Sequence, residues 1–152
     1  LSAMLEYSNN FIANQLFMQL GDDGSGAPLT MAHARQRVRE WVEGTFGWTD
    51  FRIDEGAGLS RGNRLSARQL LAVVKAFAPY RDLLPAEDSD IRAKTGTLRG
   101  VSCYAGFVRR DGDWVPFGLM INQPASWDLR LRVARDLARS GDLEGYCSSA
   151  SC

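Results

Sequence analysis

The residues with the clearest chemical meaning are Lys94-Thr95-Gly96-Thr97, at the end of a short extended run that begins at Ile91. Lys94 is one of only two lysines, against sixteen arginines, so composition alone does not explain it. An ammonium is a compact charge that can bind a carboxylate, and threonine hydroxyls can donate to the same oxygens. Gly96 has no side chain and lets another backbone approach closely. This segment predicts a site for a substrate carboxylate; the alternative is a solvated lysine before an ordinary Thr-Gly turn.

Four helices are predicted around this segment, from apolar residues that recur at helical spacing. They cover residues 7–20, 30–45, 66–77 and 126–139. Ser8 and Ser126 precede the first and last of these runs, where N-cap residues are expected. In the first helix Ile12, Leu16 and Leu20 share one face. The residues of the second helix that are expected to point inward are Ala34, Val38, Trp41, Val42 and Thr45.

Three strands are predicted at residues 91–94, 101–108 and 114–122, and a further short strand at residues 50–53. Asp111-Gly112 is a strong hairpin signal between the last two of the three. The Gly-rich stretch 54–63 lacks the glycine spacing of phosphate-binding loops. The elements together predict an α+β fold, in which a three-stranded antiparallel meander is packed with helices.

Composition excludes several classes of function. The apolar content of 45% and the charged content of 24% are typical of a globular chain. Because the formal net charge is zero, no nucleic acid or anionic membrane is expected as a partner. No apolar run is long enough to span a bilayer, and no signal-peptide pattern is seen.

Cysteine and histidine are too few for most metal or histidine-dependent chemistry. Cys103 lies in an apolar run and is expected to be a small buried hydrophobe. Cys147 and Cys152 could form a disulfide in an oxidising compartment. His33 is the only histidine, and we expect it to be structural. A zinc site or a histidine-dependent triad is therefore not expected, and no metal or cofactor is predicted.

Two short motifs point to one family. Ser8-Asn9-Asn10 fits Ser-x-Asn, and Lys94-Thr95-Gly96 fits Lys-Thr-Gly, in the order used by penicillin-recognising enzymes. The surrounding stretches 8–16, 56–67 and 92–101 are more specific. They resemble the class C, low-molecular-mass penicillin-binding proteins of the penicillin-binding protein 4 type, which are D-alanyl-D-alanine carboxypeptidases/endopeptidases. The resemblance covers residues 5–139, nearly the whole chain.

The resemblance implies a role for each matching residue. Ser8 would relay a proton to the leaving amine, and Asn10 would bond to the substrate amide and to a motif lysine. Lys94 and Thr95 would hold the terminal D-alanine carboxylate. Gly96 would leave room for the substrate, which would pair with the strand after Lys94. The N–H of Thr97 would form half of the oxyanion hole.

The family nucleophile is the serine of a Ser-x-x-Lys motif, and this sequence contains none. The chain begins at Leu1 without an initiator methionine, so we expect an upstream segment of the same protein to supply that serine. Residues 1–140 would then be the C-terminal portion of a transpeptidase-like domain, followed by a tail at 141–152. The expected partners are peptidoglycan stem peptides and β-lactams, in the periplasm. A serine β-lactamase or esterase of the same superfamily, or a non-catalytic peptidoglycan-binding module, are the alternatives.

Overall fold

The computed structural model describes residues 1–126 and 128–141. The chain forms two compact units, one made mainly of Ala3–Ser66 and the other beginning at Ala67. That residues 1–140 form part of one transpeptidase-like domain stays a prediction. The tail expected at 141–152, with Cys147 and Cys152, lies outside the described residues apart from Gly141.

The first predicted helix is wrong at its start. The predicted helix is α2, which begins at Asn10 and ends at Gln19, and a separate short helix, α1 at Ser2–Glu6, precedes it. Ser8 is not the N-cap, because Asn9 is: the Asn9 Oδ1 accepts a hydrogen bond from the Ile12 N–H at 3.0 Å. Asparagine caps helices as well as serine does, so residue type alone does not distinguish Asn9 from Ser8 as the N-cap.

The inward faces of the early helices also differ from the prediction. Ile12 and Leu16 of α2 and Leu20 at its C-cap are exposed, and Phe17 is the buried residue of α2. Helix α3, Met31–Phe46, begins as predicted, since the Thr30 Oγ1 accepts from the His33 N–H at 3.2 Å. The prediction for this helix is confirmed for the two fully buried residues and wrong for two others. Ala34 and Val42 are buried, Val38 is half-buried, and Trp41 and Thr45 are exposed.

The second unit is an antiparallel sheet between helices, and the predicted α+β class is confirmed. Its strands follow the order β1-β2-β3-β4. Their bounds are β1 Ala86–Asp88, β2 Ile91–Leu98, β3 Val101–Arg110 and β4 Asp113–Ile121. The sheet thus has four strands rather than three, because the short β1 adds to β2. The strand expected at residues 50–53 does not form, and Arg52 makes only an isolated bridge with Arg64.

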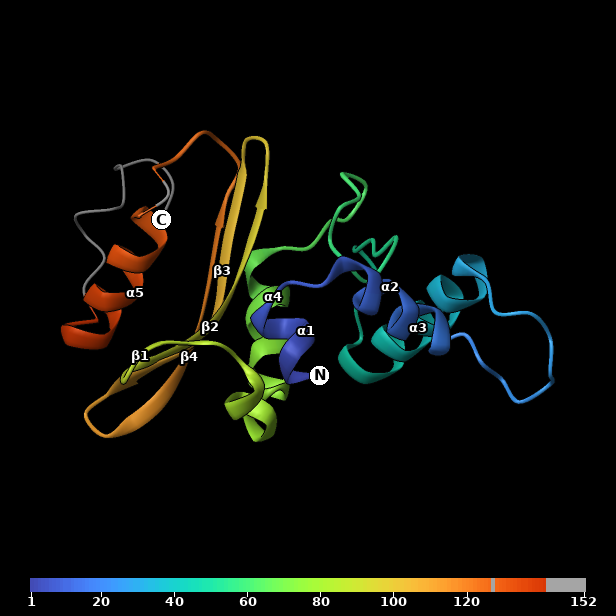
Figure 1. Cartoon of the computed structure of the whole chain (residues 1–152), viewed down its shortest axis with the longest axis horizontal. Helices are drawn as coiled ribbons and strands as arrows, with labels where there is room; N and C mark the ends of the chain where they lie inside the picture. Colours follow the sequence, from blue (N-terminus) through green and yellow to red (C-terminus); the bar gives the residue numbers. More distant parts are fainter. Residues whose placement is uncertain (127, 142–152) are drawn as a thin grey trace. The chain divides into compact units, whose positions relative to one another are not determined.

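Helices cover both faces of this sheet. Helix α4, Ala67–Ala76, packs mainly on β4, and α5, Leu129–Arg139, packs mainly on β3, on the opposite face (Figure 1). A 3-10 helix, η1 at Ala78–Leu83, connects α4 to the sheet. Helix α5 begins after Asp128, so the predicted N-cap Ser126 is wrong.

The hairpin between β3 and β4 matches its sequence signal. Asp111 and Gly112 both have positive φ, at 54° and 91°, as a two-residue turn with the twist of the flanking strands requires. This turn fixes the register of the ladder, which runs from Arg110↔Asp113 to Ser102↔Ile121. Since a slip of one residue would turn the apolar residues of β4 to the other face, the turn decides which side chains reach the core.

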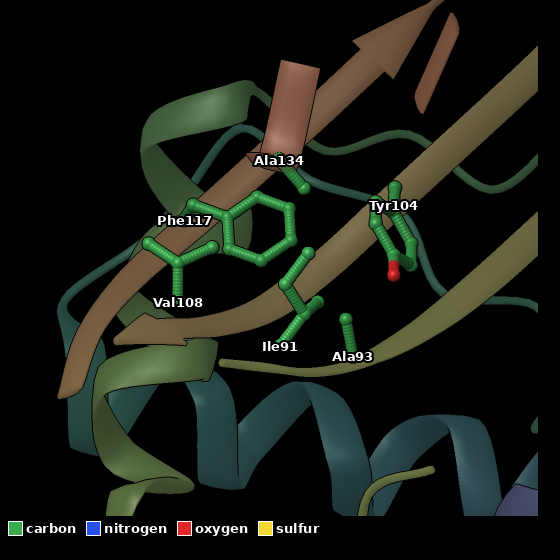
Figure 2. Close-up of a cluster of buried hydrophobic side chains, with 6 residues drawn as sticks. All are labelled: Ile91, Ala93, Tyr104, Val108, Phe117 and Ala134. Carbon is green, nitrogen blue, oxygen red and sulfur yellow. The ribbon is translucent and has the colours of Figure 1, made fainter. Parts of the chain in front are cut away.

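The core of the second unit lies between the sheet and α5. It consists of six buried residues drawn in Figure 2: Ile91, Ala93, Tyr104, Val108, Phe117 and Ala134. The rings of Tyr104 and Phe117 meet edge to face, with centroids 5.3 Å apart, which adds about 1 kcal/mol beyond the area buried. Burial raises the pKa of the Tyr104 hydroxyl, so this group stays neutral at physiological pH.

The isolated 152-residue chain is expected to be marginally stable and to self-associate. Among the described residues no strand pairs with the outer edge of β4, and open strand edges recruit other chains. In the first unit Phe11, Leu20 and Trp41 are 73%, 57% and 60% exposed, which leaves apolar area in water. Light scattering and thermal melts over a range of protein concentrations measure this. A monomer with a sharp, reversible and concentration-independent melt would contradict it.

Candidate active site

The Lys-Thr-Gly residues lie in the middle of β2, at the position where its partner on one side ends. Strand β2 pairs with β3 along its whole length, with Lys94 opposite Ala105 and Thr97 opposite Ser102. Strand β1 pairs only with the start of β2, at Ile91 and Arg92. Among the described residues, no strand pairs with the outer edge of β2 from Lys94 onward. This stretch is therefore open to an added strand.

The hydrogen-bonding direction of this open edge follows from one contact. The Ala93 N–H donates to the Pro85 carbonyl at 3.0 Å, on the β1 side of β2. Because alternate residues of a strand direct their N–H and C=O groups to the same edge, Thr95 and Thr97 present theirs to this outer edge as well. The edge thus offers two N–H donors and two carbonyl acceptors to an extended ligand.

The side chains of the motif divide between the two faces of the sheet. Ala93 belongs to the core under α5, so Thr95 and Thr97 lie on the α5 face and Lys94 on the opposite face. The Lys94 Nζ donates to the Thr95 carbonyl at 2.9 Å. Since that carbonyl points to the outer edge, the ammonium lies at the same edge. A ligand along the edge can be contacted by Lys94 from one face and by Thr95 from the other.

Ser8 and Asn10 lie in the first unit, at the start of α2. Ser8 occupies the turn between α1 and α2 and has a left-handed backbone, with φ of 49°. Asn10 is the first residue of α2, and both residues are exposed. Non-glycine residues seldom adopt this backbone, and such strain gathers at functional sites. Because Asn9 is the N-cap of α2, capping does not explain the presence of a serine at position 8.

A third element of the first unit is the loop at residues 54–63, which is held by side-chain hydrogen bonds. The Asn14 Oδ1 accepts from the N–H groups of Gly56 at 2.9 Å and Ala57 at 3.1 Å. The Glu55 carboxylate accepts from the N–H groups of Ala57 and Ser60. Burial of Glu55 raises its pKa, but these hydrogen bonds outweigh it and hold the pKa of Glu55 below its usual value. The N–H groups of Gly56, Ala57 and Ser60 are thus occupied by side-chain acceptors of the protein itself.

Arg130 also lies at this segment, although no motif in the sequence includes it. Its Nη1 donates to the Gly96 carbonyl at 3.2 Å, to the Thr97 Oγ1 at 2.8 Å and to the Cys103 carbonyl at 3.4 Å. A signal was present in the sequence. Arg130 lies three and four residues before the buried Val133 and Ala134, on the face of α5 that packs on the sheet. An arginine on the apolar face of a helix is predicted to find hydrogen-bond acceptors on the surface that the helix covers, because its buried N–H groups need partners.

The described residues contain no group of three or more His, Cys, Asp or Glu side chains placed to hold a metal ion. Over the same residues, no helix is both long enough and apolar enough to cross a bilayer.

Structural comparison identifies the fold. Penicillin-binding protein 4 from Haemophilus influenzae, in complex with a β-lactam, matches with a TM-score of 0.75 and 20% identity, over 90% of this chain and 40% of that one. A second crystal structure of that protein matches with a TM-score of 0.72 and 24% identity, over 84% of this chain and 34% of that one. A predatory endopeptidase from Bdellovibrio bacteriovorus, in complex with an immunity protein, matches with a TM-score of 0.63 and 16% identity, over 88% of this chain and 37% of that one. The chain spans about 34–40% of the length of these proteins.

The fold is thus that of class C, low-molecular-mass penicillin-binding proteins. The model of the D-Ala-D-Ala carboxypeptidase 3 (S13) family matches residues 1–86 and 80–139, and the chain belongs to this family. The family resemblance drawn from the two motifs is confirmed. Comparison with curated proteins found no match.

Proposed function

We propose that this chain carries the Ser-x-Asn and Lys-Thr-Gly parts of a serine-type D-Ala-D-Ala carboxypeptidase/endopeptidase. The open outer edge of β2 carries the proposal, because it sets a lysine, a threonine and two outward N–H groups beside the path of an extended peptide. Membership of the S13 family supports a peptidase rather than a non-catalytic module. The substrate would be a peptidoglycan stem peptide that ends in D-Ala-D-Ala, and the activity would be periplasmic.

The nucleophile would come from a Ser-x-x-Lys motif in another segment of the same protein, since no such motif lies within the 152 residues. That serine gives its hydroxyl proton to a neighbouring base, such as the lysine of the same motif, as it attacks the carbonyl carbon of the penultimate D-alanine, and the carbonyl oxygen becomes an oxyanion. The N–H of Thr97 and the N–H of the serine itself stabilise that charge. Collapse of the intermediate expels the terminal D-alanine and leaves an acyl-serine, which water then hydrolyses.

The remaining residues bind the substrate and move the proton. Lys94 and Thr95 hold the carboxylate of the terminal D-alanine, and Gly96 leaves space for the substrate backbone. The Ser8 hydroxyl passes a proton to the departing amine, and Asn10 bonds to the substrate amide. β-Lactams would acylate the same serine. No step requires a metal or a cofactor.

The test uses the full-length protein, a pentapeptide ending in D-Ala-D-Ala, and a fluorescent penicillin. Release of one D-alanine per peptide, together with a long-lived penicillin adduct, would support the proposal. An adduct that turns over rapidly, without D-alanine release, would instead indicate a β-lactamase. The absence of both a penicillin adduct and D-alanine release would contradict a catalytic role. A peptidoglycan pull-down would then test whether the protein is a binding module.

A further inference from the structure

Arg130 directs its charge at the end of the Lys-Thr-Gly segment. One nitrogen, Nη1, lies within hydrogen-bond distance of two carbonyl oxygens and one hydroxyl, on Gly96, Cys103 and Thr97. The salt bridges among the described residues do not include Arg130. Its helix is fixed on the sheet by the buried Val133 and Ala134, so the position of the guanidinium is set by packing.

The acceptor with the greatest chemical consequence is the Gly96 carbonyl. The C=O of Gly96 and the N–H of Thr97 belong to the same peptide group. A charged donor on the oxygen of a peptide group withdraws electron density from its nitrogen, and hydrogen bonds in such a chain strengthen one another. The Thr97 N–H, which points to the open edge of β2, therefore becomes a stronger donor.

The second consequence is geometric. The hydrogen bond to the Thr97 Oγ1 is the shortest of the three, at 2.8 Å, and it ties the side chain of Thr97 to α5 on the face away from Lys94. The contact with the Cys103 carbonyl links the same guanidinium to β3, across the Gly96↔Cys103 pair. The peptide group between Gly96 and Thr97 is thus held from its oxygen side and its side-chain side, while its N–H stays directed outward.

We propose that Arg130 is a positioning residue for the oxyanion hole, which it serves by holding and polarising the Gly96–Thr97 peptide group. The inference rests on the proposed function, because it needs the Thr97 N–H to receive the oxyanion. Arg130 touches neither the substrate nor the reacting atoms. It belongs to acylation and deacylation alike, since both pass through an oxyanion.

The size of the effect follows from the donor that Arg130 supports. A direct oxyanion donor contributes about 10²- to 10³-fold in rate, and cooperative strengthening is about 10–30% per hydrogen bond. Polarisation alone therefore accounts for about two- to eightfold in the acylation rate. Loss of the contacts with the Thr97 Oγ1 and the Cys103 carbonyl, which hold the peptide group in position, adds to this effect. We therefore expect complete removal of the donors to lower the acylation rate by at least about fivefold.

The test compares Arg130→Met and Arg130→Lys in the full-length protein, with Arg132→Met as the matched control. Met keeps the apolar stem without donors, whereas the lysine ammonium can again donate to Gly96 and Thr97. Arg132 lies on the same helix, and its salt bridge among the residues that the structure describes is with Asp128, at the surface. Stopped-flow measurement separates the dissociation constant of the non-covalent penicillin complex from the acylation rate constant. We expect Arg130→Met to lower the acylation rate constant with little change in the dissociation constant. Arg130→Lys should restore part of the acylation rate constant, and Arg132→Met should match wild type in both constants.

A role confined to packing would give Met and Lys variants of equal rate, and that result would overturn the inference. A boronic acid analogue of N-acetyl-D-alanine gives a second readout, because its tetrahedral adduct places an oxygen in the oxyanion hole. Its affinity should fall in Arg130→Met in proportion to the acylation rate. If Arg130→Met does not fold, Thr97→Val and Thr97→Ser decide, since only Ser keeps the acceptor of Arg130. Equal rates for these two would overturn the inference.

The two levels of the proposal fail differently. Wild-type protein that forms no acyl-enzyme and releases no D-alanine would overturn the proposed function, and the role of Arg130 with it. Normal acylation by wild type, with an unchanged rate in Arg130→Met, would overturn the role of Arg130 alone.

Discussion

In the full-length protein, Lys94→Ala is expected to abolish most peptidase turnover and β-lactam acylation while the protein remains folded. The Lys94 ammonium lies at the open edge of β2, bonded to the Thr95 carbonyl, where the substrate carboxylate would bind. Removal of one preorganised charged contact costs about 10²- to 10³-fold in rate. Lys94→Arg should rescue poorly, because the planar guanidinium differs in shape from a point charge. Steady-state D-alanine release and the rate of penicillin acylation measure both variants.

Lys75 is the matched control, since it is the only other lysine in the chain. It lies in the last turn of α4 and is exposed, so Lys75→Ala should change the free energy of unfolding by no more than about 0.5 kcal/mol and leave acylation intact. If Lys94→Ala acylated at a rate near that of wild type, Lys94 would be an ordinary lysine of the strand with no role in catalysis. The assignment of the carboxylate site would then be wrong.

The 152-residue chain alone is expected to form no covalent adduct with a fluorescent penicillin. Acylation needs an activated serine, and a serine is activated by a neighbouring base such as the lysine of Ser-x-x-Lys. No serine in the chain precedes a lysine at that spacing. Intact-mass spectrometry after incubation, with the full-length protein as positive control, measures the result. A stoichiometric adduct on the chain alone would place the nucleophile within these residues and overturn the proposal that another segment supplies it.

The sheet could be predicted from the sequence because its signals are local. Asp111-Gly112 specifies a tight hairpin, and the alternation of apolar residues after it specifies which face of β4 is buried. Strand β1 was missed because its three residues are all exposed and carry no periodic pattern. Its pairing with β2 depends on the chain returning at residues 89–90, which a reading of hydrophobic periodicity does not detect.

The first unit was harder to predict because tertiary contacts decide its faces. Ile12, Leu16 and Leu20 have helical spacing, yet Phe17 is the buried residue of α2. The reason is tertiary packing: Gly56 approaches so closely that an added Cβ would lie 2.7 Å from the Cβ of Phe17. A close contact between residues thirty-nine apart in the chain leaves no periodic trace. The motif residues were found because spacing defines them, whereas Arg130 joins them through a tertiary contact between α5 and β2.

The backbone of Ser8 has a consequence for how this position can evolve. A left-handed conformation costs a non-glycine residue about 1–2 kcal/mol, and glycine adopts it freely. Ser8→Gly should therefore raise the free energy of unfolding, which chemical denaturation can measure, and at the same time remove the hydroxyl proposed to relay the proton. An unchanged or lowered stability would show that the turn is not strained. Selection for stability alone would favour glycine at this turn. A serine is the residue expected there if selection for the hydroxyl's role in catalysis outweighs selection for stability.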